Sequence, residues 1–296
     1  MTIKHLVLMG GGPMGFMAYG ALKQLNRRKI WEHKDIKSIY ATSVGSFLGV
    51  LMLLDYKWDT LDDYIYNRPW EKMFKPVNID TMFHVYNKKG ILKEDIIYKS
   101  LKPLLNGSNL EIDVTLKEFY DYNNVELHMF SVNMNDTPIH SVDISYKSHP
   151  NLKLITAVKM SCSFPILFPP VFYENGCYID GGLLNNFPLD DCYNSLQCKK
   201  SEILAIKFIC KKNYINCDDE NNNLFNYLDF FIKKLINYLD TSNKQINIDN
   251  ICLIETDFIP YYKWIDILCD KKKRIDMIQQ GIHIANDFEL KHNEDE

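Results

Sequence analysis

The 296-residue sequence has little excess charge of either sign, since 34 basic residues stand against 38 acidic ones and the formal net charge is −4. Proteins that bind nucleic acid through their overall charge are usually strongly basic, so we expect no nucleic-acid partner. The one basic run, residues 271–274, predicts a solvated helix face. With 46% hydrophobic residues, the chain has the composition of an ordinary globular protein with a core.

The sequence also lacks the spacings that signal metal sites or redox pairs. All eight cysteines lie from Cys162 onward, and no two of them are separated by two residues. The histidines share no common spacing, and no calcium-loop pattern occurs. We therefore expect reduced cysteines that serve in packing, no metal ligands and no cofactor.

Long hydrophobic runs are missing as well. The most apolar stretch, residues 39–54, is shorter than the ~20 residues of a membrane span and contains Thr42, Ser43 and Ser46. Near the amino terminus, residues 6–9 form an apolar run too short for a secretory signal peptide. We expect an intracellular, cytoplasmic protein that touches membranes only peripherally.

The order of the elements indicates an α/β fold. Strands at 4–9 and 37–41 are each followed by a tight turn and a helix, the second of which covers residues 47–54; this favours a mainly parallel sheet covered by helices. Asn175-Gly176 lies between β-forming residues and predicts a hairpin over 173–179. Further strands are predicted at 125–132, 203–209 and 251–255, and further helices at 152–160, 224–239 and 275–290.

Three short motifs carry the candidate chemistry, and the first is a glycine loop at residues 10–15. Its G-x-G-x-x-G pattern follows a strand and precedes a helix, which is also typical of dinucleotide-binding folds. Such a fold needs an acidic residue at the end of the second strand, but that strand ends in Ala41-Thr42-Ser43. The other use of such a loop is an oxyanion hole built from backbone N–H groups.

The second motif, Ala41-Thr42-Ser43-Val44-Gly45, is close to the G-x-S-x-G nucleophile elbow, with alanine at the first glycine position. Small residues on both sides of the serine allow a strand to turn sharply into a helix. The third motif, Asp180-Gly181-Gly182, places an aspartate directly after the predicted hairpin. Taken alone, it is also typical of a turn aspartate that binds its own backbone.

These three motifs, in this order, resemble the patatin-like phospholipase family. Residues 160–165, 168–170 and 186–189 add to the resemblance, which covers residues 4 to about 209 well and the remainder loosely. It implies a three-layer α/β/α domain over 1–210, a helical cap-like insertion at about 58–108, and a carboxyl-terminal extension over 211–296. The implied substrate is a lipid ester at a membrane or lipid-aggregate surface.

The resemblance also implies roles for individual residues. Ser43 would be the nucleophile and Asp180 the general base, and Gly11 and Gly12 would form the oxyanion hole. The implied supporting glycines of the elbow and loops are Gly10, Gly15, Gly45, Gly181 and Gly182. Family members usually carry arginine or lysine where this chain has Met14, so a neutral acylglycerol becomes a more plausible substrate beside phospholipid.

Two alternatives stay open at the level of the sequence. Ser43, Asp180 and His283 occur in the chain order of an α/β-hydrolase triad, although the elbow comes early for that fold. A protein of the same fold that binds lipid without catalysis is the other alternative. The aromatic and apolar residues near these motifs are candidates for acyl-chain contact, namely Trp58, Trp70, Phe74, Phe83, Phe164, Leu167 and Phe168.

Overall fold

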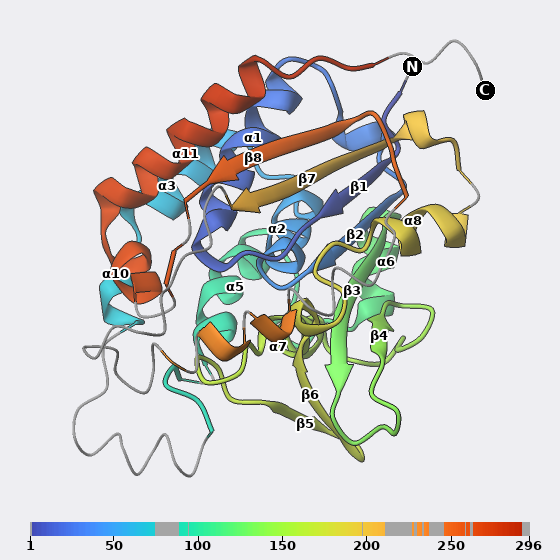
Figure 1. The fold of residues 1–296 in the computed structure, drawn as a ribbon, viewed down its shortest axis with the longest axis vertical. Helices are drawn as coiled ribbons and strands as arrows, with labels where there is room; N and C mark the ends of the chain where they lie inside the picture. The colour runs from blue at the N-terminus through green and yellow to red at the C-terminus, as the bar shows by residue number, and fades with distance from the viewer. Residues whose placement is uncertain are drawn as a thin grey trace.

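The computed structural model describes residues 2–74, 89–93, 95–196, 198–210, 246–257, 259–260 and 263–291, with a few positions between 227 and 236. Within these residues, an eight-stranded mixed sheet forms the centre of the molecule (Figure 1). Its strands are β1 (His5–Leu8), β2 (Ser38–Thr42), β3 (Glu126–Asn133), β4 (Ser141–Ile144), β5 (Val171–Tyr173), β6 (Gly176–Asp180), β7 (Ile203–Cys210) and β8 (Ile251–Thr256).

The strand order is β5-β6-β3-β2-β1-β7-β8, and β4 pairs with β3 outside this path. All neighbours from β3 to β8 along this order run parallel, whereas β4 and β6 are antiparallel to β3 and β5 is antiparallel to β6. The predicted mainly parallel sheet is therefore confirmed. Since the carboxyl ends of β1 and β2 lie at the same edge, the turns that follow them are neighbours.

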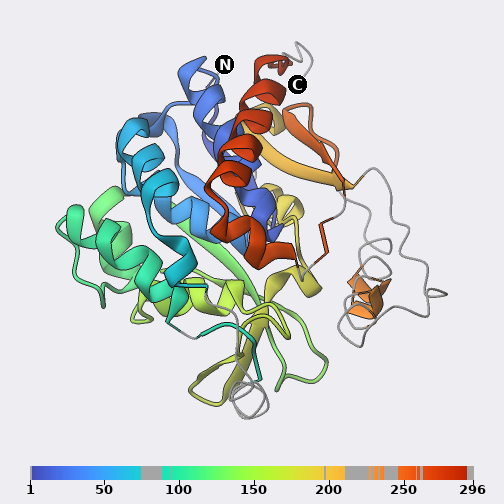
Figure 2. The same ribbon diagram turned by 90° about the vertical axis from the view of Figure 1, so that its left-hand side faces the viewer.

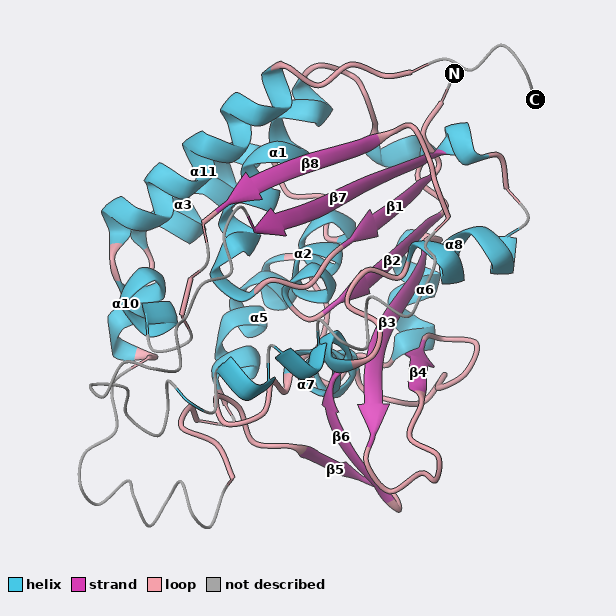
Figure 3. Ribbon diagram, in the orientation of Figure 1, coloured by secondary structure: helices cyan, strands magenta, loops and turns pink. Residues whose placement is uncertain are grey.

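Helices cover both faces of this sheet (Figure 3). Along β1, Leu6 and Leu8 pack into the main core with α1, α2 and α11, while Val7 packs into a second core with α8, as the two-residue period of a strand requires. The predicted three-layer arrangement is confirmed. The helices are α1 (Gly15–Arg27), α2 (Val44–Leu53), α3 (Trp58–Asn67), α5 (Ile96–Gly107), α6 (Leu116–Asn123), α7 (Leu154–Cys162), α8 (Leu189–Leu196), α10 (Trp264–Cys269) and α11 (Lys271–Asn286).

The first and last of these helices cross at very short range. A Cβ atom on Gly20 of α1 would lie 2.1 Å from the carbonyl oxygen of Ile278, and one on Gly281 of α11 would lie 1.9 Å from that of Met17. Figure 2 shows α11, in red, in front of the sheet beside the blue α1. Only glycine fits at these two positions, so the crossing fixes α1 against α11.

The basic run corrects one prediction. Lys271, Lys272 and Lys273 are exposed as expected, but Arg274 is only 2% exposed. Its guanidinium donates hydrogen bonds to carbonyl oxygens in the last turns of α3 and α10, at Ile65, Tyr66 and Leu268. These carbonyls have no partner within their own helices, which explains why a cation is held inside the protein.

Most other elements lie where the sequence predicts them, including the 173–179 hairpin. The helix predicted at 224–239 falls largely outside the described residues, and the division of the chain at residue 210 stays a prediction. Helix α10 was not predicted. The described cysteines are all free, and no helix in the described ranges is long and apolar enough to cross a membrane.

Candidate active site

Ser43 lies at the sharp turn between β2 and α2. Its backbone has φ 55° and ψ −126°, a conformation that is strained for any residue with a side chain. The turn brings the start of α2 against β1, where a Cβ on Gly45 would lie 2.3 Å from the carbonyl oxygen of Leu8. The predicted elbow geometry is thus present, and Ala41 is accommodated in it as a fully buried residue of β2.

Two residues at the end of α7 hold the strained serine in place. The backbone N–H of Ser43 donates to Ser161 Oγ at 3.0 Å, and Cys162 Sγ donates to the carbonyl oxygen of Ser43 at 3.0 Å. Ser161 Oγ in turn donates to the carbonyl oxygen of Phe130 on β3, at 2.7 Å. Burial raises the pKa of the Cys162 thiol well above its usual value, so the thiol keeps the proton that this contact needs.

The side chains of Ser43 and Asp180 meet directly. Ser43 Oγ donates to Asp180 Oδ2 at 2.6 Å, and the other carboxylate oxygen accepts the Gly182 N–H at 2.7 Å. Asp180 ends β6 and is 1% exposed. This burial raises its pKa to about 7, although the hydrogen bonds from Ser43 and Gly182 act in the opposite direction. A carboxylate of this kind is a stronger base than an exposed aspartate.

The glycine loop packs against this pair and is held by Asn186. Gly10 donates its N–H to the carbonyl oxygen of Asn186 at 3.1 Å, and Asn186 Nδ2 donates to the Gly10 carbonyl at 3.2 Å. Gly12 has a positive φ of 53°, and a Cβ on it would lie 2.4 Å from the ring of Trp264. Within the described residues, the N–H groups of Gly11 and Gly12 have no hydrogen-bond acceptor. They are therefore free to bind a ligand oxygen.

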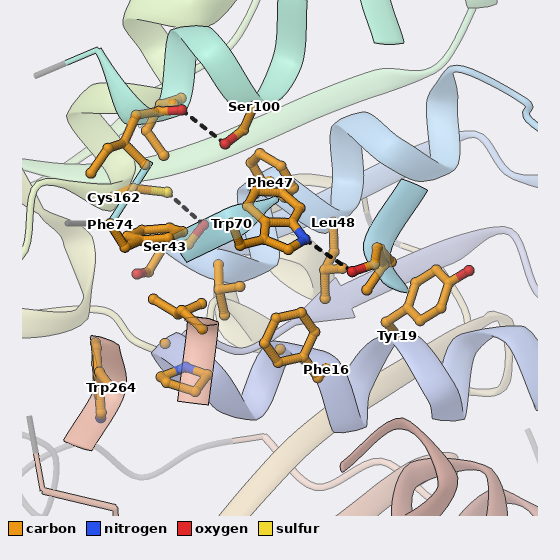
Figure 4. Close-up of a pocket in the computed structure, with 18 of the residues that line it drawn as sticks. Phe16, Tyr19, Ser43, Phe47, Leu48, Trp70, Phe74, Ser100, Cys162 and Trp264 are labelled. Carbon is orange, nitrogen blue, oxygen red and sulfur yellow. Dashed lines mark hydrogen bonds between the residues drawn. The ribbon is translucent and has the colours of Figure 1, made fainter. Parts of the chain in front are cut away.

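An apolar cavity extends from Ser43 between α1 and α2. In Figure 4, the rings of Phe16, Phe47 and Trp70 lie between Ser43 and Tyr19. Gly12 also lines the cavity, so its loop and Ser43 border the same space. The other lining residues are largely apolar: Pro13, Gly15, Val44, Leu48, Leu51, Tyr64, Ile65, Phe74, Ile96, Ile97, Ser100, Cys162, Phe164, Phe168, Trp264 and Leu268.

The aromatic candidates from the sequence divide into two groups. Trp70, Phe74, Phe164 and Phe168 line the cavity, whereas Trp58 and Leu167 pack elsewhere and Phe83 lies outside the described residues. Trp264 and Leu268 were missed because the short helix α10 has no clear periodic pattern. Asn186 stood in a segment that supported the family resemblance, but nothing in its local sequence assigned it the role of holding the glycine loop.

The histidines that the structure describes do not complete a triad. His283 is exposed on α11, and buried His128 contacts Asp143 through Nδ1 at 2.7 Å rather than Asp180. No described histidine lines the cavity or hydrogen-bonds to Ser43. The described side chains include no group of three or more histidine, cysteine, aspartate or glutamate residues that could hold a metal ion.

A serine at a strand-to-helix elbow, hydrogen-bonded directly to an aspartate, places this chain among the α/β proteins that carry a serine–aspartate pair in place of a Ser-His-Asp triad. Comparison with protein families then gives the particular family. The model of the patatin-like phospholipases matches residues 6–193, and the chain belongs to that family.

Relatives and solved structures agree with this assignment. A probable lipid hydrolase, 463L, of Invertebrate iridescent virus 6 is 28% identical over 212 residues, which are 71% of this chain and 66% of that protein. Lysophospholipase NTE1 of Kluyveromyces lactis is 24% identical over 63% of this chain but only 11% of its own length. The crystal structure of VipD from Legionella pneumophila has a TM-score of 0.50 at 16% identity, covering 96% of this chain and 67% of VipD, and so shares the fold.

Proposed function

We propose that this protein is a lipid acyl hydrolase that cleaves carboxylic esters of phospholipids or acylglycerols through an acyl-enzyme on Ser43. The observation that carries the proposal is the 2.6 Å hydrogen bond from Ser43 Oγ to a buried Asp180, beside an apolar cavity. A serine hydroxyl is a weak nucleophile until a base accepts its proton, and the raised pKa of Asp180 suits it to that role.

The proposed reaction needs no histidine. Ser43 Oγ attacks the ester carbonyl carbon as its proton passes to Asp180, and the oxyanion is bound by the free N–H groups of Gly11 and Gly12. The alcohol leaves with the proton from Asp180, which regenerates the carboxylate. Asp180 then takes a proton from a water molecule whose oxygen attacks the acyl carbon, so that the fatty acid leaves and Ser43 regains its proton.

The apolar cavity is suited to the acyl chain. Leu51 lines it on α2, eight residues beyond Ser43 at the elbow, a distance of about 12 Å at ~1.5 Å per residue. An acyl chain of medium length spans a distance of this order. We therefore expect the enzyme to favour medium-chain esters.

Labelling with a fluorophosphonate tests the nucleophile. The wild type should react and should hydrolyse a medium-chain aryl ester, whereas Ser43→Ala should lose both activities. Ser148→Ala, at an exposed turn, is the matched control and should behave as the wild type. Labelling that persists in Ser43→Ala would place the nucleophile elsewhere. A folded wild type that neither reacts nor cleaves esters would instead support a lipid-binding protein without catalysis.

A further inference from the structure

A second groove adjoins the apolar cavity and has a different chemical character. Its volume is about 420 Å³, and two of its lining residues are Lys89 and Lys159. Ile97, Cys162 and Phe168 border both spaces, so the groove and the cavity adjoin at residues beside the nucleophile. Cys162 is also the residue whose thiol donates to the carbonyl oxygen of Ser43.

The two lysines of the groove have no anionic partner in the part of the chain that the structure describes. Among the described residues, no carboxylate lies within ion-pair distance of Lys89 or Lys159. Neighbouring lysines differ in this respect, because Lys99 pairs with Asp95 at 2.5 Å and Lys153 with Asp113 at 3.6 Å. A cleft lined by charge of one sign attracts counter-ions, so this groove is an environment for an anion.

Backbone contacts fix both lysines at the groove. Gly90 forms a β-bridge with Ile166, and the N–H of Ile91 donates to the Ile166 carbonyl at 2.9 Å, which anchors the chain immediately after Lys89. Lys159 stands in the last full turn of α7, where its carbonyl oxygen accepts a hydrogen bond from Ser163 Oγ at 2.6 Å. Neither lysine therefore depends on a substrate to bring its backbone to the groove.

The rim of the groove also carries an exposed aromatic residue. Phe172 on β5 is 65% exposed, and Lys89 Nζ lies 5.3 Å from the centre of its ring. An exposed aromatic ring beside a cation is suited to the boundary between lipid headgroups and acyl chains. Met14, by contrast, packs against the main core and brings no charge to the site.

We propose that this groove binds the phosphate-bearing headgroup of a phospholipid whose acyl chain occupies the apolar cavity. The inference rests on the proposed function and narrows its substrate class from lipid esters in general to phospholipids. With the acyl chain between α1 and α2 and the ester at Ser43, the glycerol and phosphate extend past Cys162 toward Lys89 and Lys159. The two ammonium groups thereby supply the positive charge that is missing at Met14.

The test compares a short-chain phosphatidylcholine, kept below its micelle concentration, with a diacylglycerol of the same chain length and a medium-chain aryl ester. In the double variant Lys89→Gln/Lys159→Gln, kcat/KM for the phospholipid should fall at least roughly tenfold, since two charged contacts are lost. The values for the other two substrates should stay within about twofold. The double variant Lys99→Gln/Lys153→Gln removes the same charge elsewhere and should leave all three values unchanged.

Several results would overturn the headgroup assignment. An equal loss on all three substrates would mean that the lysines act on the structure rather than on the headgroup. A loss with micelles of the same phospholipid but not with the monomeric form would mean general attraction to a lipid surface. If the wild type cleaves aryl esters and the double variant hydrolyses phospholipid and diacylglycerol in the same ratio as the wild type, the headgroup assignment is wrong while the proposed function stands. A folded wild type that cleaves no ester would refute the proposed function itself.

A free phosphate ion carries the same charged group as a phospholipid headgroup. Adding inorganic phosphate to the assays distinguishes these two ligands of the groove. If the groove binds a headgroup, added phosphate should raise KM for the phospholipid in the wild type and leave aryl ester hydrolysis unchanged. If phosphate instead alters kcat for the aryl ester in the wild type but not in the Lys89→Gln/Lys159→Gln variant, the groove is a site for a free anion and the headgroup assignment is wrong.

Discussion

Asp180→Asn should make the protein inactive and, at alkaline pH, more stable. Burial raises the pKa of Asp180 from 3.8 to about 7, so the folded state keeps a proton that the unfolded chain has already released. Stability from this group is therefore complete below about pH 4 and is lost as the pH rises toward 7. Between pH 5 and 7, two pH units at about 1.4 kcal/mol each remove about 3 kcal/mol. Asparagine does not ionise and has no such loss.

Urea unfolding of the wild type and of Asp180→Asn at pH 5 and pH 8 measures this difference. The free energy of unfolding of the variant, relative to the wild type, should rise by about 3 kcal/mol between the two pH values. The control is Asp59→Asn, because the Asp59 side chain is 94% exposed; its relative stability should change by less than about 0.5 kcal/mol. A difference between Asp180→Asn and wild type that is equal at both pH values would refute the idea that Asp180 is a desolvated base.

Four further predictions concern the site. The rate of aryl ester hydrolysis should rise with pH around a single midpoint near 7, the pKa of the dyad carboxylate; a profile that is flat from pH 5 to 9 would contradict this. His128→Ala and His283→Ala should each keep at least roughly a tenth of the wild-type rate, a barrier change of about 1.4 kcal/mol or less, and one folded but inactive histidine variant would show that the dyad is incomplete. Met14→Arg should raise the ratio of phospholipid to acylglycerol hydrolysis, and an unchanged ratio would mean that this side chain does not face the headgroup. Gly45→Ala should lower stability by about 1–3 kcal/mol in urea unfolding and slow fluorophosphonate labelling, because its methyl group would meet a backbone carbonyl, whereas Gly49→Ala meets only side chains and should retain both.

The sequence predicts the parts of the site that depend on local backbone chemistry. Ser43 is found by the small residues around it, which a sharp turn between strand and helix requires. Asp180 is found because the Asn175-Gly176 turn defines the hairpin that leads to it. The strands at the centre of the sheet are found from their short apolar runs. In each of these cases the signal and the structure involve the same few consecutive residues.

The remaining features arise between residues that are far apart in the chain. Arg274 belongs to a basic run that is typical of an exposed helix face. Its burial is explained only by the carbonyls at the ends of α3 and α10. Trp264 covers Gly12 across more than 250 positions of sequence. The groove of Lys89 and Lys159 likewise joins two distant segments, so no pattern of spacing could have indicated it.

The close crossing of α1 and α11 also sets the time at which the site can form during synthesis. The glycine loop and the elbow leave the ribosome early, but α1 cannot reach its packed position until residues 271–286 are made. At ~5 to 20 residues per second, the roughly 250 intervening residues take about 10 to 50 s. During that interval the nascent chain carries Ser43 without the helix that supports the loop beside it. The proposed lipid hydrolase activity would thereby stay off until α11 has been made.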